Sequence, residues 1–280
     1  MIAPGMFLGV GAAAAWGAGD FAGGLAARRA GGMLVTAGAE VVGFLLLLGA
    51  VALLRPDAPT TSTIVLAALA GIAGGLGLAA LYRALAMGAM GLVSAVSGVG
   101  GVLIPLGVGV LILGNTIQPL QLLGVACALA AIAAASGATT RGVSREAVLL
   151  AAVAAIGFGL WFVLIDQAAE RDKLWALVIS RGTAMLLIGG AVLLRSERSG
   201  LRAVLPLVGL AGVADVAANG MAVLAFVTVP VGIVAALSGT YPLATMLLAR
   251  VVLHEALPRL GLLAVGLGVA AIVLISLGSG

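Results

Sequence analysis

The chain has 280 residues, of which 63% are hydrophobic and only 9% are charged, and its mean hydropathy is +1.30. A soluble domain carries about 25% charged residues, so this composition excludes a soluble fold and requires much of the apolar surface to face lipid. The formal net charge of +4 is small and its arginines are scattered over the loops, which argues against nucleic-acid binding.

The apolar residues form long blocks separated by short loops that hold most of the charge. A helix that crosses a bilayer needs about 20 mostly apolar residues, and blocks of this length recur along the chain. The expected helices span residues 5–25, 33–54, 62–82, 91–113, 118–136, 146–165, 174–194, 203–224, 231–252 and 260–278. The sequence therefore predicts an all-α membrane protein with ten transmembrane helices.

The first block contains a stretch that is similar to a nucleotide-binding loop. Gly17, Gly19 and Ala22 match the G-x-G-x-x-G/A pattern, and Glu40 follows at the distance of a ribose-binding acid. That fold needs a β-strand before the loop, whereas the residues here are rich in Ala and Gly and continue as one apolar block. We interpret the match as a coincidence of composition.

Trp16 and Asp20 are four residues apart in this block and share a helix face. A lipid-facing Asp would cost about 2.5–3.5 kcal/mol on translocon scales, which favours an inward position. An indole and a carboxylate on one face suit a substrate with an apolar side chain and an ammonium group. The alternative is that Asp20 lies near the helix end and reaches water or pairs with an arginine.

The two halves of the sequence can be aligned with one another. Residues 45–55 match 185–195, residues 94–101 match 235–242, and residues 130–136 match 270–276, at an offset close to 140. Residues 1–140 and 141–280 then form two repeats of five helices. Because five is odd, the second repeat is inverted in the membrane. Inverted repeats are a recurring design of secondary transporters, with a substrate site between the halves; a duplicated membrane scaffold without a cavity is the alternative.

Glu40 and Arg181 occupy similar depths in the second and seventh predicted helices, which the repeat relates to each other. An ion pair between them could form in one conformational state and break in another, and would then act as a gate. The alternative is local pairing of Arg181 with Asp166 or Asp172.

Asp215 lies near the middle of the eighth predicted helix, where an unpaired charge is expensive. We expect it to be protonated, paired or facing water, and it is the leading candidate for a proton-coupling or substrate-amine site. Asn219 follows one turn later on the same face. The alternative is a neutral structural Asp215 bonded to a neighbouring helix.

Hydroxyl groups and one arginine complete the set of candidates. Ser97 and Ser238 are equivalent in the two repeats and are each followed by glycine, so they allow close helix approach or contact a substrate. Tyr241 precedes a proline that is expected to kink its helix. Arg83 either meets a substrate carboxylate or reaches the membrane interface.

Residues of metal and catalytic sites are sparse. His254 is the only histidine and Cys127 the only cysteine, so a metal site with the usual four ligands is not expected. The sequence has neither a Ser-His-Asp arrangement nor a Walker A segment. We expect neither enzyme activity nor a bound cofactor.

These features together resemble the EamA family of the drug/metabolite transporter superfamily. The resemblance covers the whole chain, and it rests on the ten spans, the five-helix repeat, Trp16 within the first helix, and residues 237–257. In the ninth helix, Ser238, Pro242 and Glu255 match the family's small residue, proline and terminal Glu. The first half departs from this pattern, because Asn115 stands where Glu255 stands in the second.

The resemblance implies export of amino acids and other small metabolites. Exporters of the YddG type, which carry aromatic amino acids, line a central cavity with aromatic residues. Trp16, Tyr82 and Trp161 match three of those positions, whereas the fourth helix has no aromatic residue.

We therefore expect a secondary transporter that exports small metabolites, foremost neutral or aromatic amino acids, across the inner membrane by alternating access. The alternatives are export of drugs or other metabolites by proton antiport, and a non-transporting scaffold. A monomer suffices, because one chain holds both halves. The predicted substrate-binding residues are Trp16, Asp20, Tyr82, Arg83, Ser97, Trp161, Asp215, Asn219, Ser238 and Tyr241, with Glu40 and Arg181 as the gating pair.

The distribution of basic residues conflicts with the family in one respect. Most arginines lie in the loops after the odd-numbered predicted helices, so the positive-inside rule places both termini outside the cytoplasm. The family is expected to have both termini inside, so the charge distribution and the resemblance predict opposite orientations.

Overall fold

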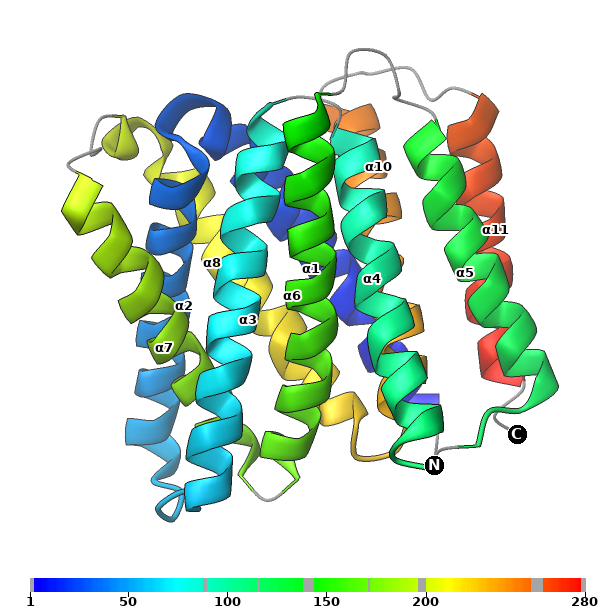
Figure 1. Cartoon of the computed structure of the whole chain (residues 1–280), viewed down its shortest axis with the longest axis horizontal. Coiled ribbons are helices and arrows are strands. Elements are labelled where there is room, and N and C mark those ends of the chain that lie inside the picture. Colours follow the sequence, from blue (N-terminus) through cyan, green and yellow to red (C-terminus); the bar gives the residue numbers. More distant parts are fainter. Residues whose placement is uncertain are drawn as a thin grey trace.

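The computed structural model of the chain is a bundle of helices (Figure 1). It describes residues 3–87, 90–114, 116–137, 144–170, 172–195, 200–252 and 259–277, and no β-strand occurs within these ranges. The helices are α1 (Ala3–Ala30), α2 (Gly32–Leu54), α3 (Thr61–Ala86), α4 (Met90–Leu111), α5 (Pro119–Gly137), α6 (Arg145–Ala169), α7 (Lys173–Arg195), α8 (Leu201–Ala225), α9 (Val231–Ser238), α10 (Tyr241–Val252) and α11 (Arg259–Leu277).

Helix α1 runs without interruption through the stretch that matches the nucleotide-binding pattern. Gly17, Gly19 and Ala22 all lie inside this helix, and no strand–turn–helix unit is formed. The glycines serve packing instead. A Cβ atom added to Gly17 would lie 2.4 Å from Ala244 Cβ of α10, so the absence of a side chain here lets α1 and α10 approach closely.

The outer surface is apolar and the interior is made of small residues. Leu45, Leu186 and Leu194 expose 59%, 72% and 88% of their surface, which indicates a lipid-facing exterior. In the described residues, six helical segments are long and apolar enough to cross a membrane: Gly32–Leu54, Thr61–Ala86, Arg145–Ala169, Lys173–Leu194, Leu201–Ala225 and Val231–Val252. The chain is therefore a multi-pass membrane protein.

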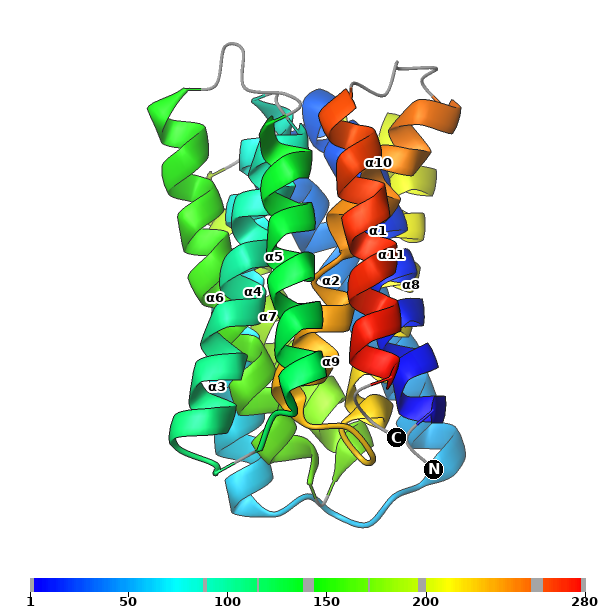
Figure 2. The same cartoon turned by 90° about the vertical axis from the view of Figure 1, so that its right-hand side faces the viewer.

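The predicted helix over residues 231–252 is divided into α9 and α10. Ser238 Oγ donates a hydrogen bond to Val234 O at 2.6 Å, and Thr240 Oγ1 donates to Leu237 O at 2.6 Å. These side chains satisfy carbonyl groups where the helix ends. The break directly precedes Tyr241, close to the expected proline kink, and it lies at mid-height of the bundle (Figure 2).

The largest helix contacts join the two halves of the chain. Helix α1 packs on α8, α3 packs on α6, α5 packs on α11, and α2 packs on α7. Glycines allow the closest of these approaches. A Cβ atom added to Gly157 of α6 would lie 2.9 Å from Gly77 Cα of α3, so these two backbones are in direct contact. The centre of the molecule is therefore lined by residues from both halves.

Candidate functional site

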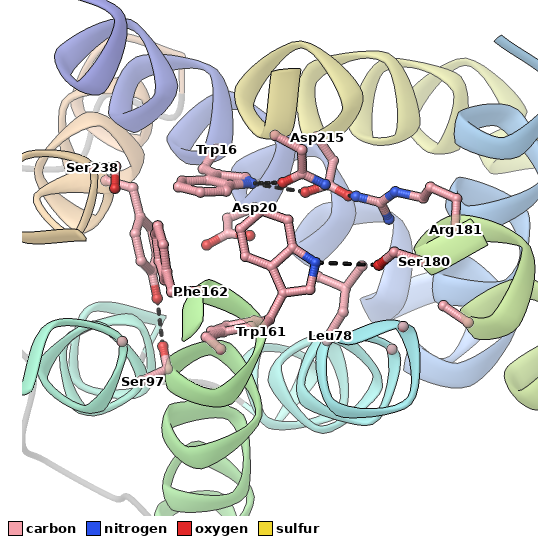
Figure 3. Close-up of a pocket in the computed structure, with 18 of the residues that line it drawn as sticks. Trp16, Asp20, Leu78, Ser97, Trp161, Phe162, Ser180, Arg181, Asp215 and Ser238 are labelled. Atoms are coloured by element: carbon pink, nitrogen blue, oxygen red, sulfur yellow. Dashed lines mark hydrogen bonds and ion pairs between the residues drawn. The ribbon is translucent and has the colours of Figure 1, made fainter. Parts of the chain in front are cut away.

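A buried cavity lies between the two halves (Figure 3). Its volume is about 70 Å³. Ten of the predicted site residues line it: Trp16, Asp20, Glu40, Ser97, Trp161, Arg181, Asp215, Asn219, Ser238 and Tyr241.

One wall of the cavity carries three charged residues from three helices. Arg181 Nη1 of α7 pairs with Glu40 Oε2 of α2 at 2.7 Å, and Arg181 Nη2 pairs with Asp215 Oδ2 of α8. The three side chains are 9%, 2% and 12% exposed. We call Glu40, Arg181 and Asp215 the charged wall. It ties α2, α7 and α8 together, because separating a buried ion pair leaves an uncompensated charge.

The ion pair between Glu40 and Arg181 that the repeat predicts is formed, but Asp215 joins it as a partner that was not anticipated. The only sequence signal for this third partner was a carboxylate in mid-helix. The alternative partner Asp172 instead accepts hydrogen bonds from Thr60 N at 3.3 Å and Thr63 Oγ1 at 3.0 Å.

Trp16 connects α1 to the charged wall. Its indole Nε1 donates to Asp215 Oδ1 at 2.9 Å and to Asn219 Oδ1 at 3.0 Å. Asp215 and Asn219 are one turn apart in α8, so their oxygens point the same way and share one donor. The spacing that marked these two residues in the sequence thus holds an indole ring in a fixed orientation.

Three aromatic rings form an apolar side of the cavity. The ring centroids of Trp16 and Trp161 are 6.0 Å apart, those of Trp16 and Phe162 are 5.6 Å apart, and those of Trp161 and Phe162 are 5.4 Å apart, all with edge-to-face geometry. Such pairs add about 0.5–1.5 kcal/mol beyond the burial of their area. Trp161 Nε1 also donates to Ser180 Oγ at 3.3 Å.

Phe162 and Ser180 were absent from the sequence-based prediction. Each stands beside a residue that was included, Trp161 or Arg181. Adjacent helix positions point about 100° apart, so sequence alone did not indicate that both members of each pair line one cavity. Both residues line the cavity because it is wide enough to contact more than one face of α6 and of α7.

Hydroxyl groups lie at the end of the cavity remote from the charged wall (Figure 3). Ser97 Oγ of α4 and Tyr241 Oη of α10 are hydrogen-bonded at 2.6 Å, and either oxygen can donate. Ser238 is also fully buried here, with its hydroxyl directed to the backbone of α9. The hydrogen bond between Ser97 and Tyr241 joins α10 to α4, and α9 also packs on α4.

Asp20 differs from the other charged residues of the cavity. It is 5% exposed and lines the cavity, and within the described ranges no hydrogen bond or ion pair reaches its carboxyl group. It lies well inside α1, away from the helix end that the alternative required. Asp20 is a buried acid that faces the cavity without a protein partner.

Two predicted substrate contacts do not line this cavity. Tyr82 is 1% exposed and packs against Gly23 of α1. Arg83 lies near the end of α3, where its Nη2 forms an exposed ion pair with Glu146 Oε1 at 2.5 Å. Arg83 follows the buried Tyr82 and lies near a helix end, so its long side chain extends to the membrane interface rather than into the cavity.

Three residues that the resemblance or the composition singled out, Asn115, His254 and Glu255, lie outside the described residues.

Comparisons with known proteins agree with this architecture. Residues 145–277 match the model of the EamA-like transporter family. A solved structure titled only "Crystal structure of protein" superposes with a TM-score of 0.75 at 20% sequence identity, over 98% of this chain and 98% of that chain. At that identity the similarity establishes the fold alone. A search of curated proteins found no significant match.

Proposed function

We propose that this chain, whose residues 145–277 match the EamA-like transporter family, is a membrane transporter and not an enzyme, and that it exports neutral or aromatic amino acids and related small metabolites. The central cavity is the proposed substrate site, and the inner membrane is the proposed location. Transport proceeds by alternating access, in which the cavity opens to one side of the membrane at a time.

One observation carries this proposal: the cavity combines edge-to-face aromatic rings with a carboxyl group that no described protein group engages. The rings of Trp16, Trp161 and Phe162 suit an apolar side chain, and Asp20 suits an ammonium group. A non-transporting scaffold would have no need for a buried acid without a partner.

The pattern of helix contacts supports ten transmembrane helices in two inverted repeats, residues 1–140 and 141–280. We count the broken pair α9 and α10 as one pass, the ninth, and α11 as the tenth. When each helix is replaced by its equivalent in the other repeat, the contact of α1 with α8 becomes the contact of α6 with α3, and both contacts are extensive. The contacts of α2 with α7 and of α5 with α11 map onto themselves. One chain thus supplies both halves, and a monomer suffices.

Polar contacts at the two ends of the α3–α6 pair are candidates for the alternating gates. At one end, Thr63 Oγ1 donates to Asp172 Oδ2 at 3.0 Å and Trp175 Nε1 donates to Asp57 O at 2.7 Å. At the other end lies the ion pair of Arg83 with Glu146. The chain reverses direction at these two ends (Figure 1), so opening one end while the other stays closed would expose the cavity to one side.

Counterflow in proteoliposomes tests the proposal. Vesicles loaded with an unlabelled amino acid should accelerate entry of the labelled one, over a panel that includes phenylalanine, tryptophan and leucine. Trp16→Ala should reduce this exchange at least tenfold, because it removes both an apolar contact and a donor to the charged wall. Phe7→Ala is the matched control, since Phe7 lies on the same helix with 77% of its surface exposed. Absence of counterflow for every member of the panel would favour the scaffold.

A further inference from the structure

We propose that Asp20 exchanges one proton for the positively charged nitrogen of the substrate. Among the small metabolites proposed above, this exchange serves small organic cations and ammonium compounds with an apolar body. The inference rests on the proposed transport function, extends its substrates to amines that lack a carboxylate, and specifies the coupling ion.

The charges of the cavity wall lead to this assignment. Three carboxyl groups line the cavity, those of Asp20, Glu40 and Asp215, and among the described lining residues Arg181 is the only basic one. Each of its two terminal nitrogens is taken up by a carboxylate of the charged wall. Asp20 is therefore left without a counter-charge from the protein.

An ionised carboxylate that is buried without a partner is strongly disfavoured. Asp20 is 5% exposed and has no donor within hydrogen-bond reach among the described residues. In the empty cavity it is therefore the neutral acid. Asp215 is 8% exposed, but both of its oxygens have partners, because it pairs with Arg181 and accepts a hydrogen bond from Trp16.

Titratable groups on neighbouring helices bring no positive charge to Asp20. Asp215 of α8, which lines the same cavity, is another acid. Tyr82 of α3 and Tyr241 of α10 also lie within electrostatic range, and these neutral phenols supply no positive charge. A cation that enters the cavity changes this balance, because it brings the missing counter-charge beside aromatic rings that also attract cations.

The exchange step is balanced in atoms and charge. The O–H bond of the Asp20 carboxyl group breaks, the proton leaves to water on the open side, and the carboxylate pairs with the cationic nitrogen. On the opposite side, a proton from water binds to the Asp20 carboxylate and the cation leaves. One monovalent cation thus moves against one proton, and the net charge of the cavity is the same in both forms.

Proton release on binding tests this exchange directly. Phenethylammonium, an aromatic organic cation, is titrated into the detergent-purified protein in weakly buffered solution. Wild type should release one proton per bound ligand, and the apparent affinity should rise about tenfold per pH unit where Asp20 is protonated in the empty protein. Asp20→Asn should abolish the release, and Asp20→Glu should retain it. Asp166→Asn is the matched control, because Asp166 lies in α6, does not line the cavity and accepts from Gln167.

Infrared difference spectroscopy gives a readout that does not depend on transport. The difference between the substrate-free and the phenethylammonium-bound protein should show the loss of a carbonyl band from a protonated carboxylic acid. This band should be present in Asp166→Asn, shifted in Asp20→Glu and absent in Asp20→Asn. Absence of this band from the wild type overturns the inference.

The two proposals fail in different ways. Counterflow without proton release overturns the exchange at Asp20 and leaves the transport function standing. A protonated Asp20 together with no counterflow for any amino acid or amine supports the protonation of Asp20 and overturns the transport function.

Discussion

Two aspartates line one cavity under nearly equal burial, yet their surroundings differ. Asp215 is 8% exposed and Asp20 is 5% exposed. Asp215 pairs with Arg181 and accepts a hydrogen bond from Trp16, whereas no described group engages Asp20. Burial of an acid therefore does not decide its role; its neighbours do. The satisfied acid holds helices together, and the unsatisfied acid is left for an external cation or proton.

The largest expected effect comes from removing the cation of the charged wall. Arg181→Met leaves Glu40 and Asp215 buried without a counter-charge, and we expect it to cost about 3–5 kcal/mol of unfolding free energy. Denaturation of the purified protein in mixed micelles measures this. A loss below about 1 kcal/mol would show that the three residues are not joined in the native protein.

Charge exchange within the wall sharpens this test. The double swap Glu40→Arg with Arg181→Glu places a carboxylate next to Asp215, so we expect little recovery of transport. Adding Asp215→Asn removes the repulsion and should restore part of it. Equal recovery in the double and the triple variant would mean that Asp215 does not belong to the wall; counterflow is the measurement.

Removing the indole donor of Trp16, which connects α1 to the charged wall, should have a smaller effect on the free energy of unfolding. Trp16→Phe keeps an aromatic ring but leaves Asp215 and Asn219 without their shared donor, and we expect a loss of about 1–3 kcal/mol. Trp161→Phe removes only the bond to Ser180, at 3.3 Å, and should cost about 0.5–1.5 kcal/mol. A larger loss for Trp161→Phe than for Trp16→Phe would contradict this order.

The exposed ion pair of Arg83 and Glu146 should contribute little to stability. Both side chains are more than half exposed, at 55% and 53%, and such pairs are worth about 0.2–1 kcal/mol. Arg83→Gln should therefore shift unfolding by less than about 1 kcal/mol. A shift as large as that of Arg181→Met would mean that this end of the molecule is closed more tightly than its exposure indicates.

The smallest change in stability is expected from substitution of Asp20. Asp20→Asn replaces a neutral acid by an amide of the same shape, so the free energy of unfolding should stay within about 0.5 kcal/mol of wild type. Asp215→Asn, which breaks an ion pair, should lose clearly more in the same denaturation experiment. Equal losses for the two variants would remove the distinction between the two sides of the cavity.

The helices and many of the cavity residues could be predicted because the cost of polar groups in lipid is a local property. Blocks of about 20 apolar residues locate the helices, and the same cost identified Trp16, Asp20 and Asp215 as inward-facing positions. The internal repeat placed Glu40 opposite Arg181. Tyr82 was assigned to the site by the resemblance to aromatic amino-acid exporters, and Arg83 as a candidate partner of a substrate carboxylate, but neither lines the cavity.

The sequence by itself determined which segments are buried in the membrane and which polar residues must avoid lipid, since both depend on composition along one helix. Only the tertiary structure decided how the charges are shared. Arg181 can reach two carboxylates at once, and the helix packing gave it Glu40 and Asp215 rather than Asp20. The distance between side chains on different helices is set by packing, so no spacing in the sequence could distinguish a paired acid from an unpaired one.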